Sequence, residues 1–208
     1  MNTLTRREVT RLINGLVAPR PIAWVSTLSA DGRRNLAPFS FFNAFSTAPP
    51  TLAFGPGSRD GIGKDSLRNI RETGEFVVNV VTEELATRAN ATSAEFPPLV
   101  DEWEVAAVTA LASEDVRPPR VAQSPASFEC RVVTIVDLGT PEQPTNSIVV
   151  GRVTRIHVAD NVLDGYEPDP SALGLVGRMG GDLWCRSSDR FELSRPASTD
   201  PDLVRASL

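Results

Sequence analysis

The stretch NLAPFSFFN (residues 35–43) places small polar side chains beside aromatic ones, directly after a turn. Residues 21–28 alternate in the manner of a β-strand, and residues 30–33 supply a turn in which Gly32 tolerates a positive φ. Residues 35–43 are therefore expected to return antiparallel to the first strand. Period-two alternation would put Phe39 and Phe41 on one face of that strand.

The polar members of this stretch are harder to explain than its phenylalanines, which suit a hydrophobic core. Asn35, Ser40 and Asn43 need hydrogen-bond partners wherever they are buried. A flat, mostly apolar ring with carbonyl and N–H groups along one edge would provide them. An ordinary buried strand is the alternative, and these residues alone leave both readings open.

The rest of the chain predicts a mainly β protein with a few short helices. Strands are expected at residues 51–55, 76–81, 126–138 and 147–159, and helices at residues 6–16, 65–73 and 83–94. With the two strands above, this makes six strands joined by hairpins, which favours an antiparallel β-barrel over a βαβ fold. We expect one domain over residues 1–196 and a polar, disordered tail at 197–208.

Composition excludes several classes of function. The 208 residues carry a net charge of -5, which argues against nucleic acid or an anionic membrane as a partner. No apolar run approaches the ~20 residues of a membrane span, and the first residues do not resemble a signal peptide, so we expect a cytoplasmic protein. One histidine, His157, and two separated cysteines predict no metal site and no usual Ser-His-Asp chemistry.

A second informative stretch, GSRDGIGKDSLRNI (residues 57–70), superficially resembles the phosphate-binding loop of nucleoside triphosphatases. The spacing from Gly57 to Gly63 is one residue too long for that loop. Asp65 also stands where a serine or threonine would coordinate magnesium. The stretch therefore does not predict a triphosphatase.

The same stretch still suits a simpler anion site at the start of a helix. With Lys64 or Asp65 as the cap, Ser66 and Leu67 would present unpaired backbone N–H groups, which attract anions. Lys64 would add a positive charge, Ser66 a hydroxyl donor, and Arg59 a second charge. A solvated cap with a surface lysine is the alternative.

Taken in order along the chain, several short motifs resemble the flavin reductase-like family with the FMN-binding split-barrel fold, which includes flavoredoxin. The matching pieces are RPIAWVST (residues 20–27), NLAPFSFFN (35–43), KDSLRNI (64–70), GEFVVN (74–79), NATS (90–93) and GRMGGD (177–182). Each motif is weak alone, but six in register are specific for the family. The resemblance implies a six-stranded antiparallel split β-barrel with short flanking helices.

The resemblance also implies bound FMN in a homodimer, with the flavin near the subunit interface. By position, the isoalloxazine and ribityl parts would be lined by Asn35, Ala37, Ser40, Phe41, Phe42 and Asn43. The phosphate end would be held by Arg59, Lys64, Asp65 and Ser66. Asn90 would lie near the flavin, and Gly180 and Gly181 are expected to approach it from the same or the partner subunit.

The function that this resemblance implies is an NAD(P)H-dependent flavin reductase, which transfers a hydride from NADH or NADPH to FMN. Because the flavin itself accepts the hydride, no catalytic side chain is needed. Reduced flavin would be supplied to a partner oxygenase or another redox partner. Two alternatives stay open: an FMN-binding electron-transfer protein without NAD(P)H activity of its own, and an oxidase acting on a small organic substrate.

Overall fold

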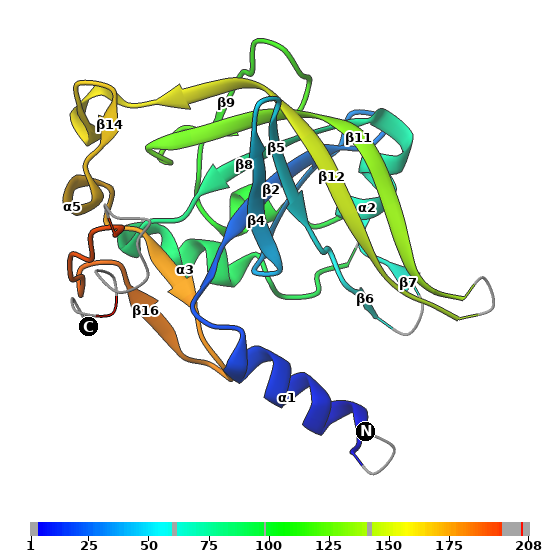
Figure 1. Cartoon of the computed structure of the whole chain (residues 1–208). Coiled ribbons are helices and arrows are strands. Elements are labelled where there is room, and N and C mark those ends of the chain that lie inside the picture. The colour runs from blue at the N-terminus through cyan, green and yellow to red at the C-terminus, as the bar shows by residue number, and fades with distance from the viewer. Residues whose placement is uncertain (1–3, 60–61, 98, 141–142, 197–204, 206–208) are drawn as a thin grey trace.

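The structure, a computed structural model, describes residues 4–59, 62–97, 99–140, 143–196 and 205. Its centre is a seven-stranded antiparallel sheet in the order β3-β2-β8-β11-β12-β5-β4 (Figure 1). The strands are β2 (Ala23–Leu28), β3 (Arg34–Phe39), β4 (Phe42–Thr47), β5 (Pro50–Phe54), β8 (Glu75–Val80), β11 (Ala126–Thr140) and β12 (Gln143–Val158). The predicted class, a mainly β split barrel with minor α content, is confirmed.

Short helices and strand pairs surround this sheet. The helices are α1 (Arg6–Leu16), α2 (Asp65–Thr73), α3 (Glu83–Ala91), α4 (Glu102–Val105), α5 (Pro170–Leu173) and the 3-10 helix η1 (Asp160–Val162). The short strands are β1 (Arg20–Pro21), β6 (Ser58–Arg59), β7 (Ile62–Gly63), β9 (Ala110–Leu111), β10 (Arg120–Val121), β13 (Leu163–Asp164), β14 (Glu167–Pro168), β15 (Val176–Arg178) and β16 (Trp184–Arg186). Among the described residues, no helix combines the length and apolar character needed to cross a bilayer.

One strand prediction was wrong, and the error explains the extra strand. Residues 35–43 do not form one strand, because β3 ends at Phe39 and β4 begins at Phe42. The two strands then lie at opposite edges of the sheet, where β3 pairs with β2 and β4 pairs with β5. The chain turns between them, so Phe39 is buried while Phe41 is 47% exposed, and they do not share a face as predicted.

The helix boundaries follow local signals that the sequence carries. Thr5 and Glu8 form a reciprocal capping box at the start of α1. Gly74 ends α2 in the left-handed conformation, with φ 71°. Both helices span the predicted residues, whereas α3 ends at Ala91, before the predicted residue 94.

The sheet separates two hydrophobic clusters. In β2, Ala23 and Val25 face the barrel interior, while Trp24 faces outward, as the strand alternation requires. The interior cluster is closed by α2 through Leu67 and Ile70. The outer cluster packs against α3 and α4 and contains Ile22, Trp24, Leu36, Val81, Leu85, Ala89, Trp103, Ala106 and Val121. This packing holds β2, β3 and the start of α2 in fixed relative positions.

Gly151 provides a test of the interior packing. A Cβ added at Gly151 would lie 2.3 Å from Cζ of Phe76. Since Phe76 is fully buried, Gly151→Ala should lower the free energy of unfolding by about 1–3 kcal/mol in a chemical denaturation measurement. Gly15→Ala is the control, because nothing lies within 4 Å of its added Cβ and alanine favours a helix. Equal stability of the two variants would contradict this packing.

Candidate functional site

A groove of about 440 Å³ lies where the chain passes from β3 to β4. Phe41, Phe42 and Phe54 give it aromatic surface, while Ser40 and Asn43 add polar groups. The other lining residues are Ile13, Val17, Pro19, Arg20, Pro21, Phe45, Ala53, Gly55, Leu138, Asn146, Ser147 and Ile148. An apolar groove with a few polar groups is the usual form of a site for a planar ligand. Four predicted residues, Ser40 to Asn43, thus line one groove.

Arg20 holds this corner of the groove together. It is only 6% exposed, and its Nε donates to Oγ of Ser40 at 3.3 Å. Its Nη1 donates to the carbonyl oxygens of Asn14 and Val17, and its Nη2 to that of Met179. The guanidinium also lies 5.8 Å from the centre of the Phe41 ring. Sequence reasoning gave Arg20 no role, although an arginine at the start of an apolar strand was a usable signal.

The N-terminus of α2 has the geometry of an anion site. Lys64 is the N-cap and makes no side-chain capping bond, which settles the choice between Lys64 and Asp65. Asp65, the first helical residue, forms an ion pair with Arg68 at 2.6 Å. Among the described residues, the backbone N–H groups of Asp65 and Ser66 have no acceptor. These donors and the helix dipole favour a negative charge at this position.

Asn35 and Ser66 are brought together as a buried pair. Nδ2 of Asn35 donates to Oγ of Ser66 at 2.8 Å, and the two residues are 7% and 1% exposed. Because the Ser66 oxygen accepts this bond, its own hydroxyl proton stays available for a further acceptor. The contact ties β3 to the start of α2.

An aromatic pair connects the helix terminus with the groove. Nζ of Lys64 lies 5.5 Å from the centre of the Phe39 ring. The Phe39 and Phe54 ring centres are 5.2 Å apart, and Phe54 lines the groove. The anion-attracting helix terminus and the groove are therefore neighbours, joined through β3 and β5.

Within its described part, the structure does not bring the remaining candidate residues into the groove or to the N-terminus of α2. Ala37 is half-buried in β3 and packs against the interior cluster. Arg59 lies in β6, and its side chain falls outside the described part of the structure. Asn90 is exposed in the last turn of α3, and within the described ranges no contact joins its side chain to the other candidates. These three residues remain predictions.

The segment with Gly180 and Gly181 contacts residues next to the groove within the same subunit. A Cβ added at Gly180 would lie 3.2 Å from Cα of Gly15 in α1, so the segment packs closely on that helix. The preceding residue, Met179, accepts the hydrogen bond from Arg20. The segment thus supports the wall of the groove from the same subunit.

A split antiparallel barrel with a mostly apolar groove beside an anion-attracting helix terminus is the arrangement expected of a cofactor-binding barrel. The family comparison is more specific: residues 16–174 match the flavin reductase like domain, and the chain belongs to this family. Membership supports a flavin cofactor and oxidoreductase chemistry.

Relatives and solved structures agree with this assignment. A protein of Halalkalibacterium halodurans is 39% identical over 94% of both chains. The crystal structure of nitrilotriacetate monooxygenase component B from Bacillus cereus has a TM-score of 0.89 and 32% identity, covering 92% of this chain and 96% of that one. The 2-nitrobenzoate 2-nitroreductase NbaA of Pseudomonas fluorescens has a TM-score of 0.85 and 31% identity over 95% of each chain.

Replacement of Arg20 tests its role at the corner of the groove. Arg20→Lys loses the forked donor and leaves several part-buried acceptors without their partner, so the free energy of unfolding should fall by about 1–3 kcal/mol. Hydrogen exchange in α1 should also become faster, because two of the acceptors lie near the end of that helix. Arg11→Lys, an exposed exchange on α1, is the control. Equal exchange rates in the two variants would contradict this role.

Proposed function

We propose that this protein binds FMN and acts as a flavin reductase that transfers a hydride from NADH or NADPH to it. The observation that carries the proposal is the junction at Phe39, which contacts Lys64 at the helix terminus and Phe54 in the groove. A phosphorylated planar cofactor needs an anion site and a ring site that adjoin each other. The similarity to nitrilotriacetate monooxygenase component B and to NbaA supports the same conclusion.

The residues present fit the two ends of FMN. The N–H groups of Asp65 and Ser66, the Ser66 hydroxyl and the charge of Lys64 would hold the phosphate, with Arg59 as a further candidate. The Asp65 carboxylate does not oppose this, because Arg68 neutralises it. The ring would lie in the groove, where aromatic surface excludes water. Ser40 and Asn43 would serve its polar edge.

Bound FMN would supply the hydride acceptor, so the chain itself needs no acid or base for the reaction. The protein would then have three tasks: to anchor the flavin, to orient it, and to exclude water from it. Arg20 fixes Ser40 and Phe41, and Asn35 fixes the Ser66 hydroxyl. Such rigid donors cost little reorganisation when the ligand binds.

A homodimer is part of the proposal. Helix α1 has no buried residue, and it projects from the barrel (Figure 1). The helix and the residue after it expose four apolar side chains, Leu12, Ile13, Leu16 and Val17. Phe45 of β4 is 70% exposed and lines the same groove as Ile13 and Val17. A second copy of the chain would bury this surface, which borders the groove, and would bring the flavin close to the subunit interface.

The final electron acceptor is a separate part of the proposal. The similarity to a monooxygenase component supports a partner oxygenase that receives reduced flavin. The similarity to NbaA favours a second candidate, direct reduction of a small nitroaromatic acid. An electron-transfer protein without its own NAD(P)H activity stays an alternative, because the same groove and helix terminus would hold FMN.

Comparison of FMN with riboflavin isolates the phosphate site. Lys64→Gln should weaken FMN binding about tenfold, because it removes one charge near the phosphate, and should leave riboflavin affinity unchanged. Fluorescence quenching of each flavin on titration measures both affinities. Arg152→Gln is the control, since Arg152 is exposed on β12 and is not one of the groove-lining residues. Equal loss for both flavins in Lys64→Gln would contradict a phosphate role.

Anaerobic reduction tests the reaction itself. The protein loaded with FMN should lose its yellow absorbance when NADH or NADPH is added without air, because hydride transfer reduces the flavin. Free FMN at the same concentration is the control. Flavin that stays oxidised with both nucleotides, yet is reduced by a protein donor, would exclude the reductase and favour the electron-transfer alternative.

A further inference from the structure

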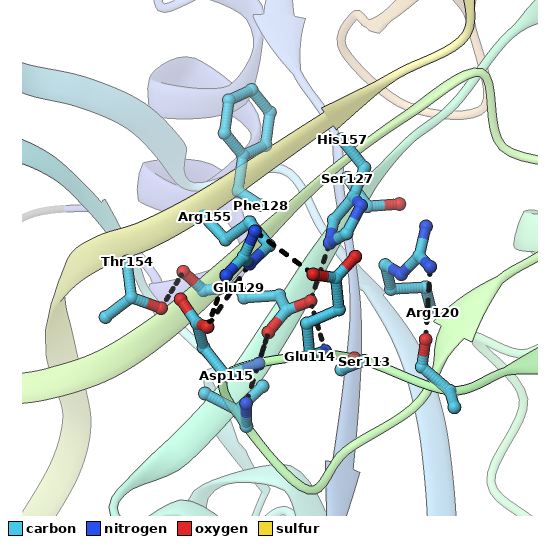
Figure 2. A network of polar contacts seen from close by, with 12 residues as sticks. Ser113, Glu114, Asp115, Arg120, Ser127, Phe128, Glu129, Thr154, Arg155 and His157 are labelled. Atoms are coloured by element: carbon cyan, nitrogen blue, oxygen red, sulfur yellow. Dashed lines mark hydrogen bonds and ion pairs between the residues drawn. The ribbon is translucent and has the colours of Figure 1, made fainter.

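A second pocket, of about 390 Å³, lies at the other end of the long β11–β12 hairpin. Its polar lining comes from Arg120, Ser124, Ser127 and His157. The remaining lining residues are Ala122, Pro125, Ala126, Ile156, Val158 and Ala159. Figure 2 shows Arg120, Ser127 and His157 around this region, with Glu129 beside them. Nothing in the proposed flavin site uses these residues.

This pocket is far from the groove. Ser127 pairs with His157 near one end of the hairpin, and Leu138, a groove residue, pairs with Asn146 near the other. Ser127 and Leu138 are eleven positions apart along β11, which corresponds to roughly 35 Å of extended strand. The pocket is thus independent of the flavin site.

Glu129 determines which ring nitrogen of His157 is engaged in a hydrogen bond. The Glu129 side chain is fully buried, and its Oε1 lies 2.6 Å from Nε2 of His157 (Figure 2). Burial disfavours the charge on Glu129, but hydrogen bonds from the backbone N–H groups of Glu114, Asp115 and Val116 and from His157 outweigh it and lower the pKa of this carboxyl. The ionised carboxylate accepts from Nε2, so Nδ1 is the ring nitrogen of His157 that Glu129 leaves unbound.

Glu129 has no capacity left for a cation. Its Oε1 accepts from the Glu114 N–H and from His157, and its Oε2 from the N–H groups of Asp115 and Val116. Four contacts fill the acceptor sites of a carboxylate. The Ser127 hydroxyl is also committed, because it donates to Oδ1 of Asn79 at 2.9 Å. The Ser124 hydroxyl lies within hydrogen-bond distance of the carbonyl oxygens of Val80 and Ala126, so its donor is committed as well. Of the polar lining residues, this leaves Arg120 and His157.

Arg120 carries a half-buried positive charge with donors to spare. Its Nη2 donates to the carbonyl oxygen of Ala112 at 3.1 Å, whereas its Nε is buried with no hydrogen-bond partner in the described part of the chain. Within the same described residues, no carboxylate forms an ion pair with Arg120. The nearby Arg155, by contrast, pairs with Glu114 and Asp115. A buried guanidinium N–H without an acceptor is costly, and an anion would satisfy it.

We propose that the pocket lined by Arg120 and His157 binds a small oxyanion, either a carboxylate or a phosphate. The forked guanidinium of Arg120 suits both kinds of oxygen pair, and His157 lines the same pocket, so its ring reports on an anion bound there. Among the described residues that line the pocket there is no carboxylate that would repel such a ligand.

The single histidine makes this proposal directly measurable. In the full-length protein, His157 contributes the only imidazole signals to a nitrogen-15 NMR spectrum, so its response is assigned without ambiguity. Inorganic phosphate and acetate are titrated separately at constant ionic strength. We expect a saturable shift of the His157 signals with one of them, and the anion that produces it identifies the ligand chemistry.

Two arginine variants separate binding from general charge effects. Arg120→Gln should weaken the anion about tenfold, because it removes the forked donor. Arg152→Gln, which removes the same charge from an exposed position on β12, should stay within about twofold of the parent affinity. If Arg120→Gln does not fold, as judged from its amide spectrum, Arg120→Lys replaces it with the same expectation, since lysine lacks the fork.

Three results would overturn the proposal. These are no saturable shift of His157 with either anion, shifts that follow ionic strength alone, and equal weakening by the Arg120 and Arg152 variants. Flavin absorbance is followed in the same samples, loaded with FMN, and separates this test from the proposed function. A shift of the His157 signals without a flavin change reports anion binding in the second pocket, whereas a flavin change on addition of phosphate reports competition at the N-terminus of α2.

Discussion

The rest of the structure depends on how the chain connects β3 to β4. These strands follow each other directly in the sequence, yet they form the two opposite edges of the sheet. Only Ser40 and Phe41 lie between them, so these residues must bridge the seam of the barrel. The bridge is held from one side by Arg20 and from the other by the Gly55 N–H, which donates to the carbonyl oxygen of Phe41. Because these two residues are held in place between the sheet edges, the surface beside them forms the groove that they line.

The same strand that leads into the seam also positions the helix terminus. Asn35, at one end of β3, bonds the Ser66 hydroxyl, and Phe39, at the other end, contacts Lys64. One strand therefore sets the relation between the anion site at α2 and the groove. Rigid placement by a strand in the core is the condition under which binding groups are well preorganised.

Local signals made much of the fold predictable, and tertiary contacts explain the misses. Capping at Thr5 and the left-handed Gly74 define helices whose bounds the sequence predicted. The break after Phe39 was missed because the alternating pattern continues through Ser40 and Phe41 without a glycine, and distant residues hold the turn. The fold class survived this error, since division of one strand changed the number of strands and not their antiparallel pairing.

The candidate site was predictable where its residues are close in sequence. Ser40 to Asn43 and Lys64 to Ser66 each form a local motif, and their residue types indicate their chemistry. Arg20 donates a hydrogen bond to the carbonyl oxygen of Met179, which is 159 residues away in the sequence, and no local sequence pattern reveals such a contact. His157 falls within the strand predicted at residues 147–159. It does lie in β12, but only the β11–β12 register brings it to the buried Glu129.

A crystal structure of the full chain with FMN would show whether the helix terminus and the groove hold one ligand. The phosphate is expected within hydrogen-bond distance of the Ser66 N–H and hydroxyl, near Lys64, and the ring in the groove beside Ser40 to Asn43. A flavin bound elsewhere, or no flavin in crystals grown with saturating FMN, would contradict this expectation.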